Sequence, residues 1–410
     1  MTSSAEQMRA WRGAAILSFG FRPFFLLGAI WAALAMVLWV FMLSGQAVLS
    51  TAFEPVSWHS HELLFGYLGA VIAGFLLTAV PNWTGRLPIV GWPLAGLVAL
   101  WIMGRIAVGV SASLAPLIVA LADLAFAVVL VGFLAREIIA GRNWKNLPVL
   151  ALLSSWAIAN ALFHWEAATG GYPAKGVGLR FGLAVAVMLI SLIGGRIVPS
   201  FTRNWLAQQK AVRLPVPFGR ADGAVLALTF ASLALWVIWP DGAVTALACG
   251  GTGLAHLWRL ARWQGLQTRA EALVWVLHAG YGFVPLGFLA IAAGRIAPGV
   301  WPGVGPAAQH VWMVGAVGLM TLAVMTRASL GHAGRPLQAN RPTTGLYLAL
   351  ILAVMARLLA GLFPGESWPL HLAAGAWIVA FGGFAMIYWP ILARPRKAAR
   401  KPMPAMKAKD

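Results

Sequence analysis

The stretch "VSWHSHELLFGYLGAVIAGFLLTAV", residues 56–80, decides the fold because it joins a polar start to a long apolar run. His59, His61 and Glu62 stand at its beginning, and the residues that follow are almost all apolar. A run of roughly 18 or more apolar residues can cross the hydrocarbon core of a bilayer, which is about 30 Å thick. We therefore expect a transmembrane helix that begins with three polar side chains.

Apolar runs of this kind recur along the whole chain of 410 residues. Hydrophobic residues make up 60% of the sequence and charged residues 10%, whereas a soluble domain has about 25% charged residues. We predict an all-α polytopic membrane protein with about twelve transmembrane helices in a single transmembrane domain, residues 1–392. The basic segment from Thr202 to Gly219 would join two candidate halves, 1–201 and 220–392. The predicted spans are 23–43, 60–80, 91–110, 115–136, 147–166, 177–197, 222–239, 243–260, 270–292, 307–326, 344–363 and 370–392.

The net charge of +19 is explained by membrane topology. If the N-terminus is cytoplasmic, 25 of the 30 Lys and Arg residues fall on the inner side, as the positive-inside rule requires. This predicts that both termini are cytoplasmic and that residues 393–410 form a basic, disordered cytoplasmic tail. The cations orient the chain and meet the anionic lipid bilayer, so we exclude nucleic acid as a partner. The outer cations are Arg105, Lys175, Arg180, Arg295 and Arg357.

Histidines gather at one level of this predicted bundle. Five of the eight lie at the outer ends of four helices, and His278 lies deeper in the ninth span. Imidazole is the commonest protein ligand of metals and the usual axial ligand of haem iron, and helix bundles build such sites from facing helices. If the His-x-His pair is helical, its rings point about 200° apart, so we favour His61 for one centre and His59 for a second metal. The candidate metal ligands are His59, His61, His164, His278, His310 and His371.

Acidic, phenolic and guanidinium groups complete the candidate site. Glu62 can orient a metal-bound imidazole or pass protons, and Tyr281 shares a helix face with His278 three residues earlier, so both are candidate catalytic residues. Three arginines within or beside outer apolar segments occupy positions where a charge is costly and usually functional. Because guanidinium matches carboxylate, they are candidate cofactor-binding partners of haem propionates: Arg105, Arg180 and Arg357.

Long segments of the chain resemble the NnrS family from about residue 17 to 392: "GFRPFFLLGAIWA", "WHSHELLFGYLGAVIAGFLLTAVPNWTGR", "GGRIVPSFTRNWL", "HAGYGFVPLG" and "MTRASLGHAGRPL". The resemblance implies a multi-pass protein of the bacterial cytoplasmic (inner) membrane that carries haem and copper. It also implies an association with denitrification and with resistance to nitric oxide. The sequence contains no Cys-x-x-Cys-His motif for covalent haem attachment, so haem b is expected. The family's characteristic polar positions correspond to His59, His61, Glu62, His278, Tyr281, Arg327 and His332.

Three functions remain open at this point. The favoured one is a haem and copper protein that binds and detoxifies nitric oxide near the periplasmic side, with electrons from a quinol or a periplasmic donor. A secondary transporter of a small solute is the second, with Asp123 as a coupling residue near the midplane. The third is a haem or copper sensing or delivery protein without turnover. The residues do not decide whether nitric oxide is consumed or only bound.

Overall fold

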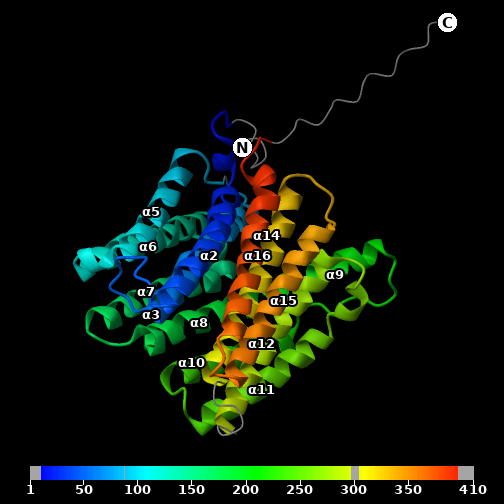
Figure 1. The fold of residues 1–410 in the computed structure, drawn as a ribbon. Coiled ribbons are helices and arrows are strands. Elements are labelled where there is room, and N and C mark those ends of the chain that lie inside the picture. The colour runs from blue at the N-terminus through cyan, green and yellow to red at the C-terminus, as the bar shows by residue number, and fades with distance from the viewer. Residues whose placement is uncertain (1–10, 87, 297–303, 396–410) are drawn as a thin grey trace, which may run out of the picture.

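Long helices build the whole of the computed structural model, which describes residues 11–86, 88–296 and 304–395 (Figure 1). No strand occurs within those ranges, and the all-α polytopic fold is confirmed. The long helices are α2 (Phe21–Leu43), α3–η2–α4 (Pro55–His61, Glu62–Tyr67, Leu68–Thr84), α5 (Trp92–Gly109), α6 (Pro116–Ala140), α7 (Leu147–Ala168), α8–η6–α9 (Val177–Leu189, Ile190–Gly194, Gly195–Gln208), α10 (Arg220–Ile238), α11 (Ala243–Ala261), α12 (Ala272–Ile296), α13–η8–α14 (Val304–His310, Val311–Gly318, Leu319–His332), α15 (Arg341–Leu362) and α16 (Trp368–Leu392). Short 3₁₀ turns are η1 (Ala15–Ser18), η3 (Ser111–Ser113), η4 (Trp144–Asn146), η5 (Pro173–Lys175) and η7 (Gly265–Thr268).

Eleven helices of the described residues are long and apolar enough to cross a membrane, and α11 is not among them. This helix forms at the predicted eighth span and packs against α10 and α12. Threonines, glycines, His256 and Arg259 lower its hydropathy. Its polar residues Thr245, Thr252, His256 and Arg259 are nevertheless buried by the neighbouring helices, whereas apolar residues such as Leu247 and Leu254 are exposed. The helix therefore turns its polar face into the bundle and an apolar face outward.

The two described ends of the chain meet at one end of the bundle. Arg22, at the start of α2, donates hydrogen bonds to the carbonyls of Leu392 (3.4 Å) and Arg394 (3.1 Å), at the end of α16. Further along the same helix pair, the Trp377 indole donates to the Ala32 carbonyl over 2.9 Å. Ends on one side correspond to an even number of crossings, so the predicted count of twelve requires α11 to cross in addition to the eleven helices above; that crossing stays a prediction. Which side this end faces stays a prediction from the charges.

Three of the long helices change to π-helical geometry part-way along, at η2, η6 and η8. Such π segments are rare and often occur at functional sites. The first of these helices begins at Pro55, five residues before its predicted start, and a proline suits the first position of a helix. His59 and His61 are therefore both helical, and their rings leave the helix in different directions.

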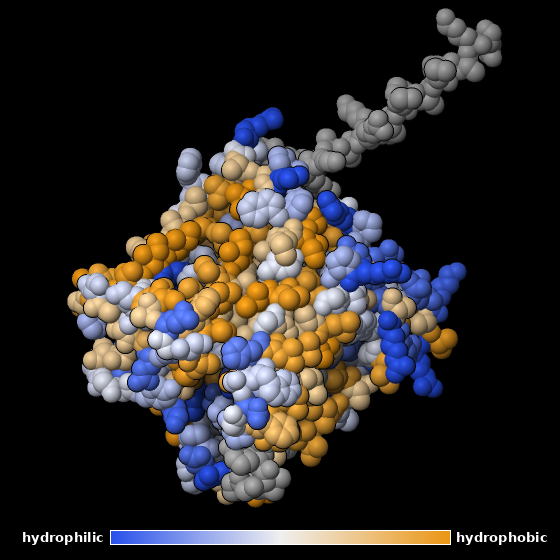
Figure 2. Space-filling view, viewed as in Figure 1, coloured by the Kyte–Doolittle hydropathy of each residue, from blue (hydrophilic) through white to orange (hydrophobic). Residues whose placement is uncertain are grey.

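Surface character agrees with a membrane-embedded bundle. Figure 2 shows hydrophobic side chains over much of the visible face and hydrophilic ones gathered towards its edges. The basic segment predicted from Thr202 to Gly219 is helical in its first part, because α9 continues to Gln208. The connection between the helices is therefore shorter than expected. The division into halves stays a prediction, and the predicted tail lies outside the described residues from residue 396 onward.

We expect a pair of cysteine substitutions to show that α11 crosses the membrane. Asp241 precedes this helix, Gln267 follows it, and both side chains are exposed, whereas the native Cys249 is buried. In intact cells a membrane-impermeant maleimide should label Asp241→Cys and leave Gln267→Cys unlabelled until the cells are opened. Labelling of both positions from outside would contradict the twelve-span topology.

Candidate functional site

A group of buried polar side chains lies between α2, α3, α5, α6 and α7 (Figure 1). Buried polar groups lose their contacts with water, so each needs a partner inside the protein. In this group the polar side chains are partners for one another. All of them are buried except Trp31, which is half-buried. We call this group the Asp123 cluster, and its members are Trp31, His61, Glu62, Arg105, Asp123, Asn160 and His164.

Helix direction brings the members of the Asp123 cluster to one level. His61 lies near the start of its long helix, Arg105 and His164 lie near the ends of α5 and α7, and Asp123 lies in the first third of α6. These are the helix ends that the predicted topology places outside. Asp123, expected near the midplane without a known partner, therefore belongs to the outer histidine level.

His61 has a carboxylate at each ring nitrogen. Its Nδ1 lies 3.0 Å from Oε1 of Glu62, and its Nε2 lies 3.1 Å from Oδ2 of Asp123. The Nε2 of His164 lies 3.0 Å from the same Asp123 oxygen. Nε2 of His61 also lies 3.1 Å from the amide oxygen of Asn160. A neutral imidazole carries one proton, so it leaves one ring nitrogen facing an acceptor without a proton. A second proton on the ring, or a metal cation at that nitrogen, satisfies both sides.

Arg105 ties the two carboxylates together. Its guanidinium donates to Oε2 of Glu62 over 2.8 Å and pairs with Oδ1 of Asp123. Gly66 makes this approach possible, because a side chain there would collide with the guanidinium. Two carboxylates against one guanidinium leave one excess negative charge while both histidines are neutral. Burying an unbalanced charge is costly, so the cluster favours one further cation.

The donor set of the Asp123 cluster suits a metal ion. Ligand atoms of His61, Asp123 and His164 lie within 4.8 Å of one another, and all three residues are buried. Imidazole nitrogen is a good ligand for copper, zinc and iron. Glu62 stands behind His61 as a second carboxylate, an arrangement that fixes ring orientation and raises ligand basicity in metal sites.

His59 faces a different environment from His61, because two residues along a helix turn the side chain by about 200°. Its ring stacks on Trp39 with centroids 4.3 Å apart, and the near-parallel ring of His310 lies on another helix with its centroid 6.4 Å away. The buried Nδ1 of His59 and the indole nitrogen of Trp39 have no hydrogen-bond partner among the described residues. These unpartnered atoms mark a place where a ligand is to be expected.

The rings of His59 and His310 both line a cavity at the outer level between six of the long helices. Its volume is about 90 Å³, below the range of about 300–1,000 Å³ found for small-molecule sites, so a larger ligand requires its lining side chains to move. Its wall is mainly aliphatic and aromatic, with the Arg357 guanidinium as its cationic group. Within the described part of the chain, none of the ion pairs involves Arg357. We call it the His59–His310 cavity; residues lining it include Met36, Trp39, His59, Leu63, Leu64, Leu183, His310, Met313, Val314, Arg357 and Trp377.

His310 has one ring nitrogen available to a ligand. Its Nδ1 lies 2.7 Å from the carbonyl oxygen of Pro306, which accepts and cannot donate, so the proton is on Nδ1. The lone pair of a neutral ring is then on Nε2, the tautomer suited to metal binding. Four of the five outer histidines thus form two pairs, His59 with His310 and His61 with His164.

Other candidate residues lie apart from both pairs. His371 is exposed and donates from Nδ1 to the Ser367 carbonyl over 2.9 Å. Arg180 donates to the carbonyls of Val237 (3.2 Å) and Lys175 (2.6 Å). Arg105 is engaged by carboxylates of the Asp123 cluster, so of the three arginines Arg357 is the one in the His59–His310 cavity.

His278 and Tyr281 lie towards the predicted inner side and belong to separate contacts. His278 Nε2 is 2.7 Å from the Thr202 hydroxyl. The Tyr281 hydroxyl is 3.0 Å from Nδ1 of His256 and accepts a hydrogen bond of 2.8 Å from Arg259. They are not brought together with the outer histidines.

Sequence reasoning missed several of these partners. Asn160 precedes His164 by four residues, a spacing that puts both on one helix face, and it donates to Asp123 over 2.8 Å. The ion pair between Asp222 and Arg259, 2.8 Å long, joins α10 to α11. The sequence showed Asp222 and Arg259 only as charges within predicted spans. It gave no sign that they pair, because they lie on different helices.

We expect Arg105→Met to destabilise the protein strongly. Removing one partner of a buried ion pair typically costs about 3–5 kcal/mol, because the other charge is left without compensation. The free energy of unfolding in a mixed-micelle denaturant titration measures this loss.

The matched control is Arg295→Met. Arg295 pairs with Asp241 over 3.7 Å, and both side chains are largely exposed, a type of pair worth about 0–1 kcal/mol. Equal losses in the two variants would contradict the central place of Arg105.

A family model described as NnrS protein matches residues 15–396, nearly the whole chain. No curated protein matches the chain. A match over this length covers every helix from α2 to α16 and both histidine pairs. The chain belongs to the NnrS family.

Proposed function

We propose that this chain is a haem- and copper-containing protein of the bacterial inner membrane that binds and detoxifies nitric oxide. The observation that carries the proposal is the separation of four outer histidines into two sites, one around a cavity and one around a carboxylate. Family membership supports the link to nitric oxide. An uncharged diatomic gas also suits a site inside a lipid-embedded bundle, because it needs no aqueous channel.

The lining of the His59–His310 cavity has the chemistry that haem requires. A haem presents a broad apolar face and two carboxylates, and this cavity offers apolar walls, two imidazoles and the Arg357 guanidinium. His59 and His310 would hold the iron, and Arg357 would pair with a propionate. Bound haem iron would supply a coordination position for nitric oxide once one of the two imidazoles leaves it. Trp39 keeps the His59 ring in place by stacking, and the apolar wall excludes water.

Copper fits the Asp123 cluster. His61, His164 and Asp123 offer two imidazole nitrogens and a carboxylate oxygen within a span that suits one ion, and the cluster has one excess negative charge. Imidazole is among the ligands that copper prefers. Glu62 acts as a positioning residue, since it fixes the His61 ring through Nδ1 and is itself held by Arg105 and by the Trp31 indole at 2.8 Å.

Detoxification by reduction would consume electrons and protons. A membrane quinol or a periplasmic carrier is the electron source that we include in the proposal. Steady-state loss of nitric oxide in the presence of a quinol separates turnover from a sensing or delivery role. Uptake of a single equivalent per site, with no further consumption, would replace the catalytic proposal with the sensing or delivery one.

Purified protein should show a Soret band that shifts when nitric oxide is added, together with copper by elemental analysis. His59→Ala and His310→Ala should lose haem and keep copper, because these residues lie at the cavity. His61→Ala and His164→Ala should lose copper and keep haem. His371→Ala is the matched control and should retain both.

Two results would overturn this assignment. A colourless, metal-free protein would exclude the proposed function altogether. Equal loss of haem and copper in all four variants, in protein that remains folded, would contradict two separate sites.

A further inference from the structure

A second cavity lies along the same three helices that carry the π segments. Its volume is about 90 Å³. We call it the lower cavity, because it lies deeper in the bundle than the His59–His310 cavity. It is lined from α4 by Leu68, Val71, Ile72, Phe75 and Leu76, from α8–η6–α9 by Ala186, Leu189, Ile190, Ile193, Gly194 and Ile197, and from η8–α14 by Val317, Met320, Thr321 and Val324.

One helical turn separates the two cavities on each of the three helices. Leu64 lines the upper cavity and Leu68 the lower one on the first helix, and Leu183 and Ala186 do so on the second. On the third helix the corresponding pair is Val314 and Val317. Three or four residues along a helix rise by about 5–6 Å and return to the same face. The two cavities are therefore successive parts of one seam between these helices.

The lower cavity is apolar throughout its wall. Its one polar side chain, Thr321, donates its hydroxyl proton to the carbonyl of Val317 over 2.7 Å and lies 2.6 Å from the Tyr67 hydroxyl. Water in a buried site needs two to four polar partners, and apolar cavities stay dry and bind apolar atoms such as xenon. Ions and protons therefore have no path here, whereas a small apolar molecule does.

The far end of the lower cavity is open. Phe75, Ile193 and Val324 line it from three helices, and each is partly exposed. Phe75 lies well inside the span of residues 55–84, so the opening faces the hydrocarbon interior of the bilayer.

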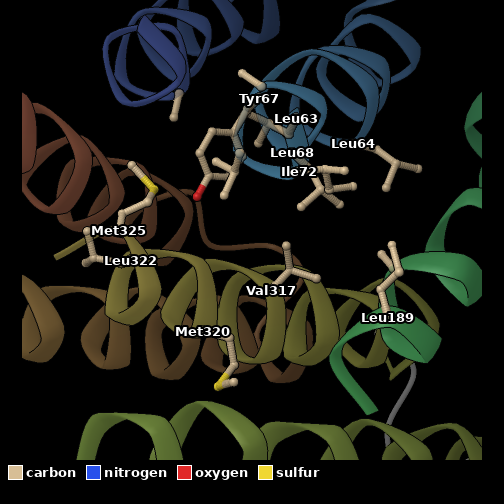
Figure 3. Close-up of a cluster of buried hydrophobic side chains, with 14 of the residues drawn as sticks. Leu63, Leu64, Tyr67, Leu68, Ile72, Leu189, Val317, Met320, Leu322 and Met325 are labelled. Atoms are coloured by element: carbon tan, nitrogen blue, oxygen red, sulfur yellow. The ribbon is translucent and has the colours of Figure 1, made fainter. Parts of the chain in front are cut away.

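Figure 3 shows side chains from the three helices. Leu64, Leu68 and Ile72 come from one helix, Val317 from a second and Leu189 from a third. Branched aliphatic side chains narrow the passage towards the histidines. Their rotamers interconvert rapidly compared with binding, so a diatomic molecule passes where a longer chain would be held.

We propose that the two cavities form one route by which a small, uncharged, apolar gas travels from the lipid interior to the His59–His310 cavity. The identification of that gas as nitric oxide rests on the proposed function. The route itself rests on the shared helix faces, the apolar wall and the opening at membrane depth. A lipid acyl chain is the rival occupant of the lower cavity.

Xenon and paired substitutions at Val317 test the route. Crystals pressurised with xenon should show xenon density in the lower cavity, a result that needs no haem. Val317→Phe should fill the passage and abolish that density. In haem-loaded protein the association rate constant of nitric oxide, measured by stopped flow, should fall about tenfold or more in Val317→Phe, a change of about 1.4 kcal/mol in the barrier. Val317→Ala should raise this association rate constant or leave it at the wild-type value.

Met188→Phe is the matched control, because it adds a ring to α8 at a partly exposed position that lines neither cavity. Its association rate should equal that of the wild type, and all variants should keep the wild-type Soret band. Unchanged association in a folded Val317→Phe variant would overturn the route. An acyl chain in the lower cavity that xenon does not displace would also overturn it. Protein without haem would overturn the proposed function, while the xenon density would still decide the route.

Discussion

Two buried carboxylates share one guanidinium, and the outer part of the N-terminal helices depends on that arrangement. Arg105 on α5 pairs with Glu62 at the start of η2 and with Asp123 on α6. None of these charges has water to solvate it, so each stabilises the protein only while the others stay in place. The negative charge left over explains why two imidazoles point at Asp123. Asp123 therefore belongs both to the ion pair with Arg105 and to the group of atoms that favours a further cation.

Helix geometry then divides the histidines between two sites. Because the second long helix begins at Pro55, His59 and His61 both belong to it and leave it in different directions. His61 enters the charged cluster, and His59 enters an apolar cavity beside Trp39 and His310. A compact set of possible metal ligands thus lies next to a separate apolar cavity that two imidazoles line. The lower cavity continues from the His59–His310 cavity between the same helices. In the proposed route its apolar wall admits uncharged molecules and excludes ions.

Much of the fold follows from the sequence, and less of the site does. Long apolar runs predicted the helices, and a helix forms at α11 as expected, although it is not among the eleven that are apolar enough to cross a membrane. The π segments had no recognisable sequence signal. Five histidines were expected at one level, yet only packing between helices shows that His371 is exposed while His310 faces His59. Asp123 was visible as an unusual charge inside a span, but its partners lie on other helices and could not be read from spacing.

The sequence by itself determined the fold class, the family and the level at which most histidines lie. These properties depend on the length of apolar runs, on the uneven distribution of cations and on continuous motifs, all of which are local along the chain. Only the tertiary structure decided which polar groups meet. His59 and His310, or Arg105 and Asp123, come together because side chains from different helices share one buried space. Such pairing depends on helix rotation and packing, for which a single sequence contains no periodic signal.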